Sequence, residues 1–409
     1  MASAAARVWR IRDFALYMGG GMPSYVSSWM QRIGVAWLAW ELTHSTTWLG
    51  LVAAADLAPM IVIAPFAGAI TDRGDPFRQF KITQFLLLGQ ALALAWLQLA
   101  GVMSISWLLV LSLWSGLVYP FHQTSRHSTV TRILPRADLA AGIASDSALF
   151  QASRFVGPAI AGPVIAFSGV GATFVAHAIG SAIFCAALLL MRVERRAVPP
   201  RTRGNLLTDV VDALRYARGH AGIWPLFVML AMACVFLRPV QEMLPAFASD
   251  VYHSDAVGLA WLASAVGVGA LVSAGSIALR GSIRGLTLMA FIGLMTFSLS
   301  TAALVATDNL WLGVFFAGIG GWSLNTMSTS VQTMTQSAVE DSMRGRVMGV
   351  YSLIWRGSPA VGALVGGFLA DRFGVRATFA GAASICFAAW FLAAPLRRGI
   401  EAAIEHPHD

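Results

Sequence analysis

The sequence is poor in charged residues and in cysteine. Only 12% of its 409 residues are charged, about half the share found in an ordinary soluble domain, whereas 57% are hydrophobic. A water-soluble fold cannot bury that much apolar surface, so a soluble protein is excluded. The three cysteines and eight histidines form no ligand spacing, so we expect no disulfide framework, no metal and no cofactor.

Catalytic and nucleotide-binding motifs are missing as well. The chain shows no glycine-rich phosphate loop and no nucleophile elbow, which argues against ATP-driven transport and against an enzyme. The formal net charge is +8, but the cations are spread over many short segments. A nucleic-acid surface gathers them in one patch, so nucleic acid is not an expected partner.

Long apolar runs are abundant. A spanning helix needs about 20 predominantly apolar residues, and the chain offers twelve such runs. They predict spans at Phe14–Leu42, Thr47–Thr71, Gln79–Ala100, Ser106–Thr124, Leu139–Phe167, Ala172–Met191, Ile223–Ala248, Ala256–Leu279, Leu286–Ala306, Leu310–Gln332, Val347–Ala370 and Ala377–Pro395. The predicted fold class is an all-α integral membrane protein with two pseudo-symmetric six-helix bundles around a central cavity.

The distribution of Lys and Arg predicts the orientation, because cations accumulate on cytoplasmic segments. With the N-terminus inside, all but six of the 28 Lys and Arg residues fall on inner segments. Two of the six, Arg372 and Arg376, fall on outer loops, and four fall inside spans. We therefore expect a multi-pass protein of a bacterial-type inner membrane with both termini in the cytoplasm.

A polar linker divides six spans from six. The predicted parts are an N-terminal half (1–192), a linker (193–221), a C-terminal half (222–397) and a cytoplasmic tail (398–409). Within the linker, apolar residues at 206, 207, 210, 211 and 214 recur at helical spacing. They predict an amphipathic helix on the inner membrane surface.

The two halves look related. Arg154-Phe-Val-Gly-Pro158 in the fifth span resembles Arg356-Gly-Ser-Pro359 in the eleventh, and Arg73-Gly74 after the second span resembles Arg280-Gly281 after the eighth. Matches at equivalent places in the two halves indicate a duplicated six-span unit.

This organisation resembles the major facilitator superfamily of transporters. Gly68-Ala-Ile-Thr-Asp72-Arg73 is similar to the signature G-x-x-x-D-R-x-G-R-[RK] of the loop between its second and third spans, and Arg78 matches the trailing cation. The resemblance implies a gating role for Gly68, Asp72, Arg73 and Arg78. It also implies a monomeric transport unit.

A second motif resembles that of antiporters in the superfamily. Arg154-Phe-Val-Gly157-Pro158-Ala-Ile-Ala-Gly162-Pro163 is similar to their fifth-span motif, although Pro163 replaces its last glycine. The segments Leu134–Leu139 and Arg344–Gly349 resemble the branch that contains the enterobactin exporter and related secretion effectors. The resemblance implies an exporter.

Charged residues inside spans are the candidate site, because a charge at a helix centre costs about 2.5 kcal/mol or more. Arg32 and Asp56 lie equally far from the outer turn near His44, so they fall at one depth. They either line the cavity, with Asp56 exchanging a proton, or form a permanent ion pair that locks the hairpin.

Asp146 and Arg154 are eight residues apart in the fifth span, so they share a helix face. We expect Arg154 near mid-membrane and its counterpart Arg356 in the eleventh span. Two such arginines suit an anionic or carbonyl-rich solute. The alternative is that each arginine caps the carbonyls of a neighbouring helix.

The seventh span carries Arg238 and Glu242, which can pair along a helix. Pro239 and Pro245 flank Glu242 and predict a break, and broken helices commonly form carrier sites. Desolvation disfavours a buried carboxylate, so Glu242, Asp56 and Asp146 are the candidate proton carriers.

Asn325 in the tenth span either lines the cavity or forms an interhelical hydrogen bond without a transport role. The charges and the resemblance together predict a secondary transporter. It would export a small organic solute, siderophore-like or amphipathic and drug-like, by proton antiport and alternating access. Two alternatives stay open: a proton-coupled importer of a small organic acid, and a transport-inactive membrane scaffold or sensor. The expected partners are the solute, protons and the lipid bilayer.

Overall fold

The computed structural model describes residues 7–193, 206–280 and 282–405. Helices, joined by short turns, are the regular structure throughout these ranges. The chain divides into two compact units. Unit 1 contains residues 1–44, 58–202 and 255–260, and unit 2 contains residues 45–57, 203–254 and 261–409.

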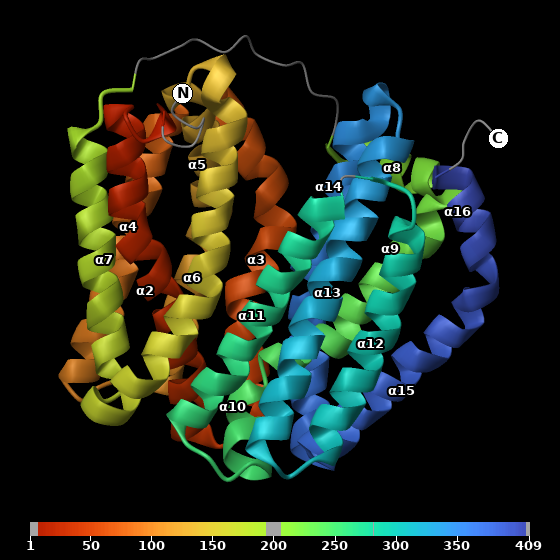
Figure 1. The fold of residues 1–409 in the computed structure, drawn as a ribbon. Helices are drawn as coiled ribbons and strands as arrows, with labels where there is room; N and C mark the ends of the chain where they lie inside the picture. The colour runs from red at the N-terminus through yellow and green to blue at the C-terminus, as the bar shows by residue number, and fades with distance from the viewer. Residues whose placement is uncertain (1–6, 194–205, 281, 406–409) are drawn as a thin grey trace. The chain divides into compact units, whose positions relative to one another are not determined.

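Unit 1 is a bundle of long helices. Its elements are α2 (Arg12–Thr43), most of α3 (Thr46–Arg73), α4 (Pro76–Leu99), α5 (Ile105–Ile133), the short η1 (Arg136–Asp138), α6 (Leu139–Ser168) and α7 (Gly171–Leu190). Helix α2 packs against α6 and α7, and α4 packs against α5 and α7 (Figure 1). A core of large side chains, including Tyr17, Phe80 and Phe184, fills the space between them.

Unit 2 is a second helical bundle. Its elements are α8 (Leu206–Gly219), α9 (Ile223–Met232), η2 (Ala233–Leu237), η3 (Arg238–Gln241), α10 (Leu244–Ala246), η4 (Phe247–Val251), most of α11 (Ala256–Arg280), α12 (Leu286–Ala306), α13 (Leu310–Ala338), α14 (Asp341–Phe373), α15 (Val375–Ala393), η5 (Ala394–Leu396) and α16 (Arg397–Glu405). Helix α12 packs against α13 and α15. The first residues of α3 also belong to this unit.

Polar side chains mark where helices begin. Asp75 accepts hydrogen bonds from the amides of Phe77 and Arg78 at the start of α4. Asn309 accepts from Trp311 and Leu312 at the start of α13. Such caps satisfy amides that have no partner within their own helix, so the loops direct the chain into each following span.

The segment predicted as the seventh span is irregular. After α9 it passes through a π-turn, a 3₁₀-turn, one short α-turn and a second π-turn. Pro239 and Pro245 lie in this stretch, and each lacks the amide that an α-helix requires. The predicted break is therefore present. Residues 238–241 are 3₁₀ rather than α-helical, and the pairing that we expected between Arg238 and Glu242 stays a prediction.

Helix α5 corrects the predicted end of the fourth span. The sequence suggested a helix that ends at Thr124 and an inner loop that begins near Arg126, but α5 continues to Ile133. Arg126 is consequently a buried helical residue. The apolar run ends before the helix does, because the last turns bury small polar side chains such as Ser125 and Thr129.

Nine helical stretches among the described residues are long and apolar enough to cross a membrane. Helices α2, α6 and α13 match three further predicted spans in position but are not among the nine. In α6 the reason is plain, because it carries Asp146 and Arg154. The count of twelve therefore stays a prediction.

The linker helix is present as α8. Ala213 and Ala217 are fully buried, whereas Val210, Val211 and Leu214 are exposed. An exposed apolar stripe suits a helix that lies on a membrane surface. At the other end of the chain, α16 buries Ile400 and Ile404. Glu405 accepts hydrogen bonds from the amides of Gly285 and Thr287, which caps α12.

Candidate functional site

A buried ion pair joins α5 to α6 in unit 1. The Nη2 atom of Arg126 lies 3.5 Å from Oδ2 of Asp146, and each side chain is only 5% exposed. Burying two charges costs several kcal/mol per ion unless their partners compensate. Ionisable residues in predicted membrane helices are functional candidates by default.

Two tyrosines from α2 extend the ion pair into a hydrogen-bonded network. The hydroxyl of Tyr17 donates to Oδ1 of Asp146 at 2.7 Å, and the hydroxyls of Tyr17 and Tyr25 are 2.9 Å apart. Both tyrosines are buried. Three helices thus converge on one carboxylate, and the hydroxyls form a chain along which hydrogen bonds can be rearranged.

Aromatic rings surround the Arg126 guanidinium. Its central carbon lies 5.2 Å from the Tyr25 ring centroid and 5.1 Å from that of Phe150. The Nε atom of Arg126 is buried and has no hydrogen-bond partner within the described residues. A buried donor without a partner is costly, so the contacts described here do not fully compensate the burial of this guanidinium.

The same aromatic cluster extends to two more arginines. The ring of Trp29 lies 6.3 Å from that of Phe150. The guanidinium carbons of Arg154 and Arg32 lie 5.3 and 5.7 Å from the Trp29 centroid. The residues Tyr17, Tyr25, Trp29, Arg32, Arg126, Asp146, Phe150 and Arg154 are called the arginine–aromatic cluster below. It presents planar cations and flat rings from α2, α5 and α6.

Glycine lets α2 and α6 approach closely enough to form this cluster. A Cβ atom on Gly157 would lie 2.4 Å from Cβ of Trp29 and 2.7 Å from the carbonyl oxygen of Val26. Pro158, beside it, is buried. A Cβ on Gly162 would lie 2.3 Å from Cβ of Ala260. The antiporter-like motif is therefore a close packing surface of α6.

In unit 2, Arg238 is held by α14. Its guanidinium donates to the carbonyl oxygen of Trp355 and lies 4.7 Å from the centroid of that ring. Arg356 is the next residue and is half-buried, as is Glu242. The structure thus brings Arg238 close to α14 beside Arg356. The sequence did not predict this contact, and the carbonyl-capping alternative for Arg154 and Arg356 stays a prediction.

Asn325 on α13 forms hydrogen bonds to a neighbouring helix. Its side-chain amide donates to the carbonyl oxygen of Ala270 and to Oγ of Ser273, both on α11. These bonds tie α13 to α11, as the interhelical alternative expects, and a cavity-lining role for Asn325 stays a prediction.

Of the predicted gating motif, Gly68 lies within α3 and is half-buried, and Arg78 lies in the first turn of α4 and is exposed. The side chains of Asp72 and Arg73 lie outside the described part of the chain, so their gating role stays a prediction. Asp56 and Arg32 belong to different units, so their pairing also stays a prediction. No group of three or more His, Cys, Asp or Glu in the described ranges is placed to hold a metal.

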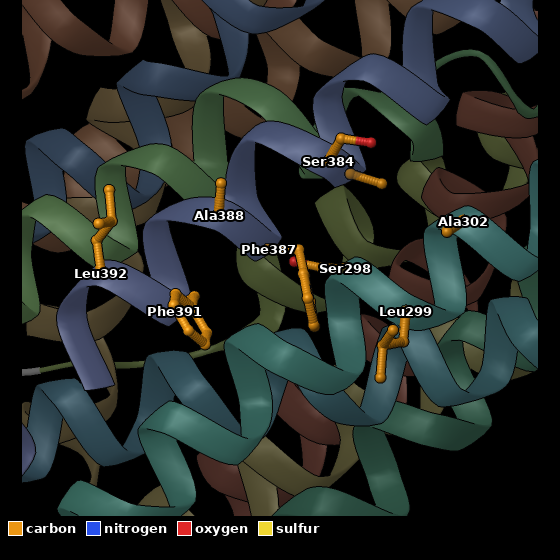
Figure 2. Close-up of a pocket in the computed structure, with 9 residues that line it drawn as sticks. Ser298, Leu299, Ala302, Ser384, Phe387, Ala388, Phe391 and Leu392 are labelled. Carbon is orange, nitrogen blue, oxygen red and sulfur yellow. The ribbon is translucent and has the colours of Figure 1, made fainter. Parts of the chain in front are cut away.

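A separate groove of about 530 Å³ lies between α12 and α15 (Figure 2). Its lining residues are Ser298, Leu299, Ala302, Ala383, Ser384, Phe387, Ala388, Phe391 and Leu392. The lining is almost entirely apolar, and Phe391 and Leu392 are largely exposed. It holds none of the predicted site residues and has the surface that lipid-facing helices present.

Sequence reasoning missed Arg126, because we counted it among the inner-loop cations. A usable signal was present. His122, Ser125, Arg126, Thr129 and Val130 recur at helical spacing and are all buried. A buried helix face made of small polar residues was not recognised as a continuation of the span. The aromatic partners on α2 were missed because aromatic residues are common in any apolar run.

Comparison with known proteins identifies the family. The model of the transmembrane secretion effector family matches residues 9–405. The staphyloferrin A transporter of Staphylococcus aureus is 24% identical over 373 residues, which cover 88% of this chain and 91% of that protein. The multidrug efflux pump Tap of Mycolicibacterium fortuitum is 23% identical over 359 residues, which cover 85% of this chain and 86% of that pump.

A solved structure shows the same fold. The crystal structure of a POT family transporter in complex with 5-aminolevulinic acid superposes with a TM-score of 0.77 at 11% identity. The match covers 95% of this chain and 96% of that one. The expected fold class, an all-helical membrane protein with the transporter fold, is confirmed. The chain therefore belongs to the transmembrane secretion effector family of the major facilitator superfamily, a family of multi-pass membrane transporters rather than enzymes.

Proposed function

We propose that the protein exports a small organic solute in exchange for protons by alternating access. The observation that carries the proposal is the buried pair of Arg126 and Asp146 with its tyrosine chain. Protonation would remove the charge of Asp146 and with it the attraction to Arg126. The pair can therefore couple proton binding to a change in helix packing. The relatives named as an efflux pump and a siderophore transporter support export.

The arginine–aromatic cluster supports an anionic or carbonyl-rich solute. Guanidinium groups present forked donors that match carboxylates in pairs, and Trp29 and Phe150 offer flat apolar faces. Unit 1 contributes three guanidinium groups and one carboxylate to this cluster. Siderophore-like solutes combine oxygen-rich anionic groups with a compact organic frame, so they are the preferred class over amphipathic cations.

The proposed mechanism moves the two halves, 1–192 and 222–397, about a central site, with the linker and both termini in the cytoplasm. Protons that enter would neutralise Asp146, and Asp56 and Glu242 are further candidate carriers. One charge that moves through 100 mV supplies about 2.3 kcal/mol. At about 1.4 kcal/mol per tenfold, this energy supports a solute gradient of roughly 40-fold.

The test is accumulation in bacterial cells that lack or overproduce the protein. Metal-free staphyloferrin A is the anionic probe and ethidium is the amphipathic cation. Export of the anion lowers its cellular content in overproducing cells, and a protonophore should abolish the effect. Lower ethidium content instead would replace the proposed solute class with drug-like cations. Unchanged content of both probes, with the protein verified in the membrane, would favour a scaffold without transport.

A further inference from the structure

The signature G-x-x-x-D-R, which begins at Gly68, occurs a second time at the end of α14. Residues 367–376 read Gly-Phe-Leu-Ala-Asp-Arg-Phe-Gly-Val-Arg. They match the pattern G-x-x-x-D-R-x-G at Gly367, Asp371, Arg372 and Gly374, with a trailing cation at Arg376. The orientation predicted from the arginine distribution assigns residues 371–376 to the outer side and residues 73–78 to the inner side. Gly374 has a φ of +81°, which favours glycine at this turn.

Asp371 binds the beginning of α3. Its Oδ1 atom accepts from the amide and from the hydroxyl of Thr46, each at 2.7 Å. Its Oδ2 atom accepts from the hydroxyl of Ser45 at 2.7 Å and from the amide of Thr47 at 3.2 Å. The first amides of a helix lack internal partners and carry a partial positive charge. A carboxylate from α14 therefore caps α3.

Below this cap the two helix backbones touch within unit 2. The hydroxyl of Thr46, which has a single proton, shares it between Asp371 and the carbonyl oxygen of Gly367, which lies 2.8 Å away. A Cβ on Gly367 would lie 2.4 Å from the carbonyl oxygen of Thr46, and one on Gly50 would lie 2.3 Å from that of Ala363. Small residues spaced by four face each other on both helices, which is the pattern of close helix contacts in membranes.

The two arginines of the motif make other contacts. Arg376 pairs with Asp308 in the turn between α12 and α13. The Arg372 guanidinium lies 4.9 Å from the ring centroid of Phe368, on its own helix. Asp308 is therefore a nearby carboxylate whose partner is Arg376 rather than the start of α3. Its substitution is a matched control.

We propose that Asp371 is the latch of an outer gate. It holds residues 45–57 on α14 in the state seen here and releases them when the outer side opens. The four hydrogen bonds end on one carboxylate, so they form and break together. Residues 45–57 belong to unit 2, whereas the rest of α3 belongs to unit 1. Release of this segment detaches the beginning of α3 from unit 2. The latch rests on the proposed alternating-access function.

The experiment measures exposure of a buried reporter in the full-length protein. Ala54 follows Thr46 and Gly50 in the same i,i+4 row of α3 and is 5% exposed. Ala54→Cys should react slowly with a membrane-impermeant maleimide added from outside. Adding Asp371→Asn should raise the labelling rate about tenfold, which corresponds to about 1.4 kcal/mol and lies in the range of a lost helix cap. The matched control Asp308→Asn should change the rate by less than about twofold.

Equal labelling rates in Asp371→Asn, in Asp308→Asn and in the parent reporter would overturn the latch. If Asp371→Asn does not insert, Thr46→Val removes one hydroxyl and keeps the capped amide. It should raise the rate about threefold, and an unchanged rate would also overturn the latch. Labelling needs no solute. Faster labelling without transport of any probe would therefore retain the latch and reject the exporter, and transport with unchanged labelling would do the reverse.

Discussion

Arg126 on α5 and Asp146 on α6 lie 3.5 Å apart, and neither side chain is more than 5% exposed. The hydroxyl of Tyr17 adds a third helix to the contact. A pair buried this deeply is a poor source of net stability, because desolvation offsets most of the attraction. The proposed function assigns the pair a role in transport, in which a proton reaches Asp146. The first two predictions separate this role from a structural one.

Asp146→Asn should uncouple transport from protons. The amide keeps the size and accepts from Tyr17 but cannot gain or lose a proton at physiological pH. Net export driven by a pH gradient should fall at least about tenfold, which corresponds to about 1.4 kcal/mol, while exchange of labelled for unlabelled solute continues. The measurement compares the two assays on the same vesicles. If gradient-driven export survives in this variant, Asp146 is not the proton carrier.

Removing one partner should destabilise the protein, and removing both should restore its stability. Asp146→Leu leaves a buried guanidinium without its counter-ion, at a cost of about 3–5 kcal/mol. The double variant with Arg126→Met should recover most of that loss but not transport. Thermal unfolding in detergent measures the stability. The exposed pair of Arg7 and Asp138 is the control, since Arg7→Gln should cost less than about 1 kcal/mol. Recovery of both stability and transport would make the pair purely structural.

Trp29 should contribute to solute affinity. Its ring lies against the guanidinium groups of Arg154 and Arg32, and such contacts contribute about 1 kcal/mol. Trp29→Leu should raise the half-saturating concentration about fivefold and leave the maximal rate nearly unchanged. Arg154→Lys keeps the charge but loses the planar fork and should give a similar loss. Trp107→Leu, at an exposed tryptophan, is the control. Equal effects at Trp29 and Trp107 would remove Trp29 from the site.

The arrangement of helices could be read from the sequence because apolar length is a strong signal at lipid depth. The apolar runs at 79–100, 172–191 and 286–306 coincide with α4, α7 and α12 to within a few residues. The break after Arg238 was predictable too, since proline cannot supply the missing amide. The end of α5 was not, because polarity alone does not separate a loop from a helix face that is buried among other helices.

The candidate site was only partly predictable for a related reason. Asp146 and Arg154 stood out because charges are rare in spans. Arg126 was signalled only by a row of polar residues at helical spacing. Its contact with Asp146, and that of Trp29 with Arg154, depend on how three helices pack. Asp371 was overlooked because a charge at a helix end is ordinary, and only the contact with Thr46 shows what it does.

Gly157 should be intolerant of any side chain. A Cβ there would meet Trp29 and the backbone of Val26, so Gly157→Ala should lower stability by about 1–3 kcal/mol. Gly19 in α2 has nothing within 4 Å of its Cβ position. Gly19→Ala should therefore stabilise by up to about 1 kcal/mol, because alanine favours helix. Thermal unfolding of both variants measures the contrast. If both substitutions change the unfolding temperature in the same direction, the result contradicts the close packing of α2 and α6.

His220 should make stability depend on pH outside the membrane. Its Nδ1 atom accepts from the amides of Gly222 and Ile223, at the start of α9. Burial lowers the pKa of His220 below its usual 6.5, so the folded protein favours the neutral ring. This stabilisation is present above pH about 6.5 and is lost as the pH falls toward the lowered value.

His220→Asn keeps an acceptor that does not titrate. The variant should lose part of the fall in thermal stability that occurs as the pH drops below about 6.5. An identical pH profile for His220→Asn and the parent protein would show that this ring is not the group that titrates.

Proton-driven export is tested most directly in inside-out membrane vesicles that are loaded with an acidic buffer and supplied with metal-free staphyloferrin A. With the lumen one pH unit more acidic than the medium, one exchanged proton supports accumulation of up to about tenfold. The accumulation should vanish when an ionophore collapses the gradient. Accumulation that is equal with and without the pH gradient would contradict proton-coupled export.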